Sequence, residues 1–399
     1  MFLKRVSHLP AAIFLVLAAA TAGGETLAAS ADEALTEAQK RVAANPRDPG
    51  ALRALADAFE VKGQPAEARL AYQKSLEIDP QQVEARAGLA RALAQMGENA
   101  AALAEQQKVA DLLPKDPAAQ YFLGVIALRA GERDRAVAAW KRTLGIEADH
   151  AWALNDLGMA LLEQRREGEA IPHLERAAAL APALGTARTN LGYAYLRAGR
   201  PADAIKEYRA ALALARDDPD AYRNLAIAHL ETKQPQEAVP LLVQAIRLRQ
   251  DPETVRDLGV ALLEAGQLDE AELVMKDVVA VRPDWGAAHV DLGRVLAARG
   301  ELDPAAASLQ KGLGLDAKDA EGHLALGHIL LGRKDYAPAW RHAREAERLG
   351  HSGARVLLAD LAGESKEPGR EEPPTAKTEE PPAKKTEPAP AKKTKSGRR

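Results

Sequence analysis

A regular period of about 34 residues is the feature of the sequence that most constrains its fold. One alanine returns at this spacing along most of the chain, and only the step between Ala238 and Ala271 is shorter, by one residue. A leucine thirteen positions before each alanine keeps the same spacing, and glycine or alanine follows every leucine. The nine alanines are Ala68, Ala102, Ala136, Ala170, Ala204, Ala238, Ala271, Ala305 and Ala339. Nine units in phase predict an array of repeated supersecondary units.

One unit of the array, residues 186–214, shows what each repeat is expected to form. Two amphipathic segments, with apolar residues at spacings of three and four, flank the sequence Ala-Gly-Arg-Pro. Gly199 can adopt the left-handed conformation that ends a first helix, and Pro201 stands where a second helix begins. Neither helix buries its apolar face alone, so the pairs are expected to stack. The small residue after each leucine lets the helices of one pair approach closely.

These features resemble the tetratricopeptide repeat family, whose helix-turn-helix unit has the same 34-residue period. The resemblance covers nine repeats over residues 49–353 and includes the leucine-glycine pair and the second-helix alanine. It also includes the proline that ends a repeat, at Pro80, Pro114, Pro182 and Pro283. The resemblance implies an all-α fold, a right-handed superhelical solenoid of helix-turn-helix repeats.

Two departures from the family pattern concern the backbone. The turn glycine is replaced by a long basic residue in three repeats, at Arg165, Lys233 and Lys334. Pro172 and Pro240 fall inside second helices, where each removes a backbone donor and is expected to bend the helix.

Residues 1–22 have the layout of a secretory signal peptide. Lys4 and Arg5 precede an apolar run, and Ala20-Thr21-Ala22 has the small residues of a cleavage site. This pattern predicts an exported protein, periplasmic or secreted; a retained membrane anchor is the alternative, because no charge lies between Arg5 and Glu25. The chain has no cysteine, which excludes disulfides, thiolate metal sites and a lipid-modified N-terminal cysteine.

The two ends of the array are expected to be covered by single helices. Residues 31–46 are predicted to contain an N-terminal capping helix or half-repeat, with Ala34 at the second-helix alanine position. Residues 354–362 are predicted to form the C-terminal capping helix. Repeat arrays need such terminal units because the last apolar face has no neighbour.

Residues 363–399 form a tail rich in proline, lysine and glutamate, without leucine, isoleucine, valine or aromatic residues, and this composition predicts disorder. The tail nets +3 and residues 1–22 net +2, which leaves about −8 on residues 23–362. The repeated Ala-Lys-Lys-Thr of the tail resembles linker-histone tails and would neutralise phosphates irrespective of sequence. We favour the alternative, contact with an anionic surface such as a membrane leaflet or cell-wall polymer, and not with nucleic acid. The lysines concerned are Lys384, Lys385, Lys392, Lys393 and Lys395.

The sequence contains no recognisable catalytic or cofactor motif. It has no glycine-rich phosphate loop with its lysine, no GxSxG and no HExxH. His323 and His328 are five positions apart on a predicted helix, so they are expected to face different ways and not to share a metal. We therefore expect no enzyme activity, cofactor or metal site.

In the tetratricopeptide family the first helices line the concave surface, and the residue just before the leucine faces it. Five successive repeats here carry a short oxygen-bearing side chain at that position, named below as the polar ladder: Asp156, Asn190, Asn224, Asp257 and Asp291. The series resembles the asparagine ladder with which O-linked N-acetylglucosamine transferases hold an extended peptide backbone. Asn190 and Asn224 match that pattern directly. The aspartates accept but do not donate hydrogen bonds, and so would favour backbone amides or a basic ligand.

Basic and apolar residues accompany the polar ladder. Arg188, Arg223 and Arg256 lie one or two positions before it, and Tyr193, Ile227 and Val260 lie three positions after it. Such a mixed strip suits a peptide or protein segment, although asparagine at this position also serves to tie adjacent helices together. The resulting hypothesis is a protein-binding scaffold. Its alternatives are an envelope-assembly accessory held by the basic tail, a regulatory subunit of an enzyme and, without export, a nucleic-acid-associated protein.

Overall fold

The computed structural model describes residues 24–365. This part of the chain contains twenty α-helices and no β-strand, and it divides into two compact units. The predicted signal peptide and nearly all of the predicted tail, including its lysines, lie outside the described residues. Among residues 24–365, no helix has the length and apolar character needed to span a bilayer.

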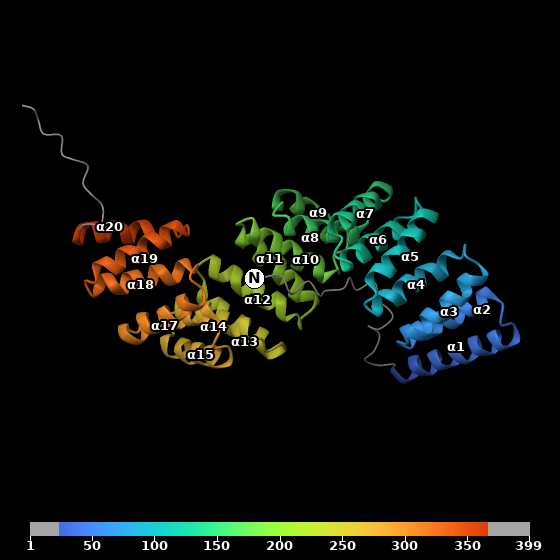
Figure 1. Cartoon of the computed structure of the whole chain (residues 1–399), viewed down its shortest axis with the longest axis horizontal. Coiled ribbons are helices and arrows are strands. Elements are labelled where there is room, and N and C mark those ends of the chain that lie inside the picture. The colour runs from blue at the N-terminus through green and yellow to red at the C-terminus, as the bar shows by residue number, and fades with distance from the viewer. Residues whose placement is uncertain (1–23, 366–399) are drawn as a thin grey trace, which may run out of the picture. The chain divides into compact units, whose positions relative to one another are not determined.

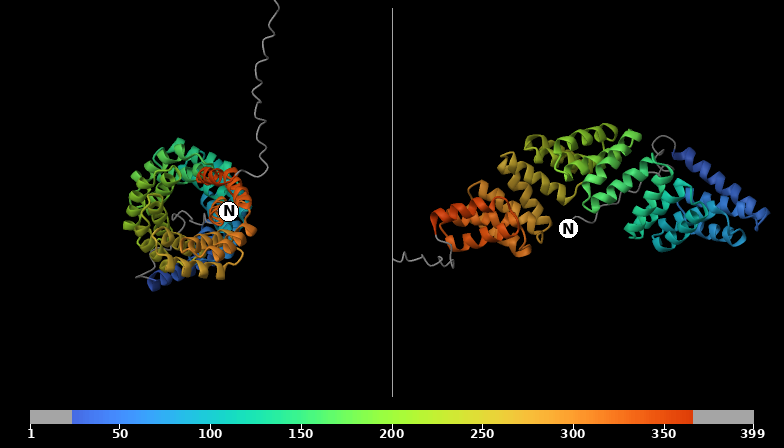
Figure 2. Two further views of the ribbon diagram at one scale, coloured as in Figure 1. Left: turned by 90° about the vertical axis from the view of Figure 1, so that its left-hand side faces the viewer. Right: turned by 90° about the horizontal axis from the view of Figure 1, so that it is seen from above.

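The first unit, with described residues 24–281, holds the helices labelled α1 to α15 (Figure 1). Helix α1 (Gly24–Ala44) precedes seven helix pairs. The first helices of the pairs are α2 (Pro49–Val61), α4 (Val83–Gln95), α6 (Pro117–Arg129), α8 (Ala151–Glu163), α10 (Gly185–Arg197), α12 (Pro219–Glu231) and α14 (Pro252–Glu264). The second helices are α3 (Pro65–Ile78), α5 (Asn99–Leu112), α7 (Arg133–Ile146), α9 (Glu167–Leu180), α11 (Pro201–Leu214), α13 (Pro235–Leu248) and α15 (Leu268–Val281). Within this unit, successive pairs stack along a superhelical path (Figure 2).

The second unit, with described residues 282–365, holds two further pairs and a last helix. The pairs are α16 (Gly286–Ala298) with α17 (Leu302–Leu315), and α18 (Ala320–Gly332) with α19 (Tyr336–Arg348). Helix α20 (Ala354–Glu364) packs on α19 and α18, and its Leu357 and Leu361 are fully buried.

The periodic residues form the core of each pair. All nine alanines of the repeat are fully buried, and the side chain four positions later is buried in every repeat, for example Tyr72, Trp140 and Tyr208. The small residue after the leucine lies under these side chains. A Cβ atom added to Gly124 would lie 2.4 Å from Trp140 Nε1, and one added to Gly192 would lie 2.9 Å from Tyr208 Cε1. The predicted close approach of paired helices is therefore confirmed.

The turn inside each repeat requires a left-handed residue, whichever side chain stands there. Gly199 has φ +71°, and Arg165, Lys233 and Lys334 have φ of 58°, 58° and 63° at the equivalent places. The three basic residues thus keep the turn but adopt a conformation that costs a side chain about 1–2 kcal/mol. Helices α9 and α13 each continue through their internal proline, Pro172 or Pro240.

The end helices differ in detail from the sequence expectation. Helix α1 begins at Gly24, ahead of the predicted start at residue 31, and Ala38 is its buried contact while Ala34 is exposed. Ala34 occupies the repeat position that a first helix would normally cover, and no described helix precedes α1. Helix α20 runs beyond the predicted end at residue 362, to Glu364.

Candidate functional site

The polar ladder lies on consecutive first helices. Asp156, Asn190, Asn224 and Asp257 come from α8, α10, α12 and α14 of the first unit, and all four are half-buried. Asp291 belongs to α16 of the second unit, where it is buried and accepts a hydrogen bond from Arg294 at 3.1 Å. The four residues of the first unit are placed by the same register and differ in their partners.

Asp156 is held by two donors that sequence analysis did not identify. The Tyr121 hydroxyl donates to its Oδ2 at 3.0 Å, and Asn155 Nδ2 donates to its Oδ1 at 3.0 Å. Burial raises the pKa of the Asp156 carboxyl to about 6, and the two hydrogen bonds act against this rise. Asp156 is therefore a half-buried acid that ties α6 to α8.

Asn190 is tied to the preceding helix in the same way. Its Nδ2 donates to Asn155 Oδ1 at 2.8 Å, and Asn155 itself is buried. Asn155 thus bridges Asp156 and Asn190, and α8 and α10 are joined by an amide pair. At these two places the polar ladder helps to fix the spacing of adjacent first helices.

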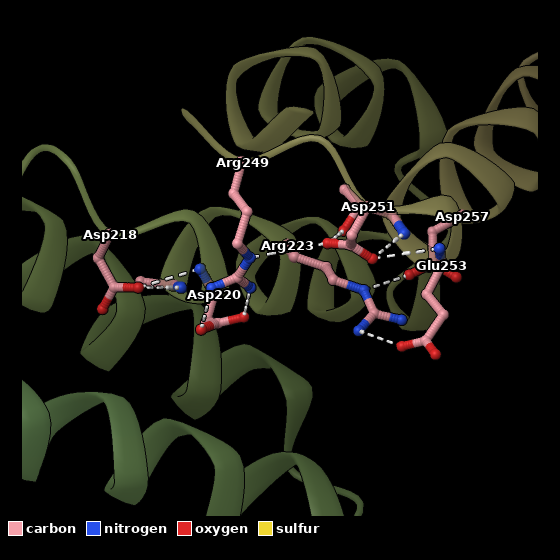
Figure 3. Close-up of polar contacts among 9 residues, drawn as sticks. Asp218, Asp220, Arg223, Arg249, Asp251, Glu253 and Asp257 are labelled. Atoms are coloured by element: carbon pink, nitrogen blue, oxygen red, sulfur yellow. Dashed lines mark hydrogen bonds and ion pairs between the residues drawn. The ribbon is translucent and has the colours of Figure 1, made fainter. Parts of the chain in front are cut away.

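Asp257 forms an ion pair between α12 and α14 (Figure 3). Arg223 Nε donates to its Oδ2 at 2.6 Å, and Glu253 Oε2 lies 3.9 Å from an Arg223 terminal nitrogen. Burial raises the pKa of the Asp257 carboxyl, and Arg223 limits the rise. Because removing one member of a half-buried ion pair leaves an uncompensated charge, substitution of Arg223 or of Asp257 alone should destabilise this junction.

The loop beside this ion pair accounts for the one shorter step of the repeat. Residues 215–218 separate α11 from α12, whereas only Arg249, Gln250 and Asp251 separate α13 from α14. In the short loop Arg249 pairs with both carboxylate oxygens of Asp220, and Asp251 caps α14 through the amides of Glu253 and Thr254 (Figure 3). Charged contacts thus hold the two repeats together across the shorter loop.

One register position explains these links. The partner of each ladder residue stands just before the ladder position of the preceding repeat: Tyr121 for Asp156, Asn155 for Asn190, and Arg223 for Asp257. For Asn224 the corresponding residue is Thr189. Its hydroxyl donates to the Gly185 carbonyl of its own helix at 3.2 Å.

Asn224 consequently differs from its neighbours. Its side chain makes no hydrogen bond to any other part of residues 24–365, and it is half-buried. Half-buried apolar side chains, Tyr193, Ile227 and Val260, lie on α10, α12 and α14. Asn224 therefore retains an unused hydrogen-bond donor and acceptor, between the engaged residues Asn190 and Asp257 of the first unit.

The arginines near the polar ladder are placed unequally. Arg223 joins the ladder through Asp257, but Arg188 pairs with Glu207 of α11 at 3.1 Å, on the second helix of its own repeat. Tyr193 contacts Arg197, whose terminal nitrogen lies 3.3 Å from the Tyr193 hydroxyl. Arg256 also has an interaction partner within residues 24–365.

The histidines of α18 are not paired with each other. His323 Nδ1 lies 2.8 Å from Nδ1 of His342 in α19, and its Nε2 lies 3.2 Å from the Ala317 carbonyl. Burial lowers the pKa of His342 to about 4, helped by His323 and Arg341. Within residues 24–365, no group of three or more histidine, aspartate or glutamate side chains is placed to hold a metal ion.

Comparison with known proteins identifies the repeats. Two family models, both described as tetratricopeptide repeat, match this chain. One matches residues 22–83, 123–184 and 189–253, and the other matches residues 61–126 and 262–329. No curated protein matches the chain.

Solved structures resemble the fold at low sequence identity. A tetratricopeptide repeat protein from Parabacteroides merdae is 15% identical, with a TM-score of 0.54 over 62% of this chain and 98% of that one. The Cut9 and Hcn1 hetero-tetramer structure matches with 14% identity, a TM-score of 0.47, and coverage of 84% and 94%. YrrB, described as having an unusual peptide-binding site, matches with 21% identity, a TM-score of 0.42, and coverage of 50% and 100%.

The fold, the buried repeat residues and the family models agree over most of the sequence. Proteins built from this repeat serve as interaction scaffolds, and the fold is generally not catalytic. The chain belongs to the tetratricopeptide repeat family.

Proposed function

We propose that this protein is a non-catalytic scaffold that binds an extended segment of a partner protein along the first helices of its first unit. The observation that carries the proposal is the free amide of Asn224 among ladder residues that are otherwise engaged. An amide that is half-buried without a partner loses water contacts, and a ligand backbone can supply both missing hydrogen bonds. The apolar side chains on the same helices would contact the side chains of the bound segment.

The fixed members of the polar ladder have a supporting role in this proposal. Asp156, Asn190 and Asp257 hold consecutive first helices at a set spacing, so the Asn224 amide is presented on a rigid surface. Binding to a preorganised surface avoids part of the entropy cost of ordering protein side chains. We therefore place recognition at Asn224 and assign helix-to-helix contacts to the other three residues.

The test compares two substitutions. Asn224→Ala should weaken partner binding by about five- to tenfold, the value of one or two hydrogen bonds, and leave the melting temperature unchanged. Thr189→Asn should also weaken binding, because an asparagine at this position can pair with the Asn224 amide as Asn155 pairs with Asn190. The amide is then kept but is no longer available to the partner. The partner is first captured from the envelope fraction of the source organism, identified, and then titrated in purified form by calorimetry.

Asn155→Ala is the control for packing. It removes the bridge between Asp156 and Asn190 and should lower the melting temperature. If Asn224→Ala binds the purified partner as the unchanged protein does, Asn224 is not the recognition residue. If Asn224→Ala unfolds the first unit instead, the amide is a packing group and the proposal is wrong.

We further propose that the protein is exported and that its basic tail contacts an anionic surface. The signal-peptide pattern of residues 1–22 and the lysines of residues 384–395 support this proposal. Fractionation of the source cells tests export, and sedimentation with anionic vesicles at rising salt tests the tail. Recovery of the protein with the nucleoid, and binding to DNA that a truncation after Leu361 abolishes, would favour the nucleic-acid alternative.

A further inference from the structure

An apolar cavity of about 340 Å³ lies among α4, α5 and α6 of the first unit. Its walls include Val83 and Ala94 of α4, Val109 of α5, and Phe122 and Ile126 of α6. The cavity lies outside the described polar ladder, which starts at α8.

Phe122 connects the cavity with the register of the ladder. It stands in α6 where Asp156 stands in α8, one repeat later. A half-buried aromatic ring thus replaces the oxygen-bearing side chain, and it lines the cavity. The surface of the first helices therefore changes from polar to apolar between the fourth and the third repeat.

Six polar side chains line the cavity. Glu84 and Gln95 are exposed to solvent, and three others are already engaged by the fold. Gln106 Nε2 donates to the Ala119 carbonyl at 3.1 Å, and Asp116 Oδ1 accepts from the Ala119 amide at 3.0 Å. Arg91 is paired with Glu60 at 2.8 Å. These groups are not free to orient a ligand.

Arg129 differs from these engaged groups. It is the last residue of α6, its side chain is half-buried at the cavity wall, and no acidic group among residues 24–365 pairs with it. Burial lowers the pKa of its guanidinium, and no carboxylate counters this effect. Arginine nevertheless stays charged, and a partly desolvated charge without a counter-ion is costly. Its planar donors fit a carboxylate through two parallel hydrogen bonds.

We propose that the cavity binds one anchor residue of a partner polypeptide, whose apolar side chain enters the cavity while an adjacent carboxylate pairs with Arg129. The cavity volume is near the lower end of the roughly 300–1,000 Å³ typical of ligand sites. The site combines an apolar wall with one unpaired cation. It therefore suits a single residue of a longer chain better than a small molecule that needs several polar contacts. The choice of a polypeptide rests on the proposed function.

The experiment measures binding of small probes to the full chain by saturation-transfer NMR. The probes are N-acetyl-phenylalanine, its amide, and N-acetyl-phenylalanyl-glutamate amide. The first carries a terminal carboxylate and the third a side-chain carboxylate, so the two distinguish the source of the anion. At least one of the acids should bind about tenfold more tightly than the neutral amide, because a charge-assisted bidentate pair is added.

Arg129→Gln should reduce binding of that acid to the level of the neutral amide without changing the binding of the amide itself. Ala87→Leu places extra volume at the cavity wall and should weaken all three probes. Arg209→Gln, a change at an exposed arginine of α11, is the matched control and should bind as the unchanged protein does. Circular dichroism melts confirm that each variant is folded.

Two results would overturn the inference. One is acid binding by folded Arg129→Gln that equals binding by the unchanged protein, and the other is failure of every probe to bind the unchanged protein. The outcome is separable from that of the proposed function. Asn224→Ala should leave probe binding intact, so loss of partner binding in that variant tests the polar ladder alone.

Discussion

The three basic residues in left-handed turns predict a measurable instability that glycine relieves. Lys233 has φ 58° in the turn between α12 and α13, its side chain is exposed, and no hydrogen bond or ion pair of that side chain occurs within residues 24–365. Replacing it with glycine therefore removes no contact, and the effect is confined to the backbone.

The size of the effect follows from two opposing terms. The left-handed conformation costs a non-glycine residue about 1–2 kcal/mol. A glycine makes the unfolded chain more flexible at its position, and the loss of this freedom on folding costs about 0.5–1 kcal/mol. Lys233→Gly should therefore stabilise its repeat by about 0.5–1 kcal/mol. The same reasoning applies to Arg165→Gly and Lys334→Gly, whose side chains are also exposed.

The matched reverse substitution is Gly199→Lys, at a turn with φ +71° where an added Cβ meets no atom within 4 Å. It should destabilise the neighbouring repeat by a similar amount. Urea unfolding followed by circular dichroism measures both changes, and hydrogen exchange locates them, because repeat arrays unfold with partly independent units. An unchanged or lower urea midpoint for Lys233→Gly, together with an unchanged midpoint for Gly199→Lys, would refute the argument from backbone strain.

Four further outcomes are expected. The pKa of Asp156 is raised to about 6 in the folded protein, so the folded form holds the proton more tightly than the unfolded form. The contribution of Asp156 to the free energy of unfolding should therefore fall as pH rises from about 4 to 6. Asp156→Asn should abolish this pH dependence in urea unfolding. The pKa of His342 is lowered to about 4 in the folded protein, so the unfolded form takes up the proton first. The protein should therefore lose stability as pH falls from about 6.5 to 4. His342→Gln should remove that loss, measured by thermal melts. Gly124→Ala should cost about 1–3 kcal/mol, because its Cβ would clash with buried Trp140. Gly145→Ala, a helical position with nothing within 4 Å, should instead stabilise α7 by about 0.5–1 kcal/mol in the same urea assay.

The repeat fold could be predicted from the sequence because it depends on contacts within one period. The buried alanine, the leucine and the small residue that follows it recur at fixed spacing, so each repeat shows the same packing. The start of α1 was harder to predict, since residues 24–30 belong to no repeat. The exposure of Ala34 shows that a register position is buried only where another helix covers it.

The polar contacts could not be predicted from the position of the ladder alone. Five side chains of similar chemistry occupy one register. For the four in the first unit, the available partner is set by a different position in the preceding repeat, which holds in turn tyrosine, asparagine, threonine and arginine. Arg188 illustrates the same difficulty. It precedes the ladder by two positions, and its long side chain reaches Glu207 on the second helix instead.

The pattern of partners is also the reason that the proposed function rests on a single free amide and not on the whole ladder. A repeat array can fix its curvature only through contacts between adjacent repeats, and the pairs Tyr121–Asp156, Asn155–Asn190 and Arg223–Asp257 supply such contacts. Each pair consumes hydrogen-bonding capacity that a ligand would otherwise use. Thr189 is too short to reach the next helix and bonds to its own, which leaves Asn224 unpaired between two fixed junctions. Under the proposed function, rigid neighbours and one unsatisfied amide would recognise a peptide backbone at low entropic cost.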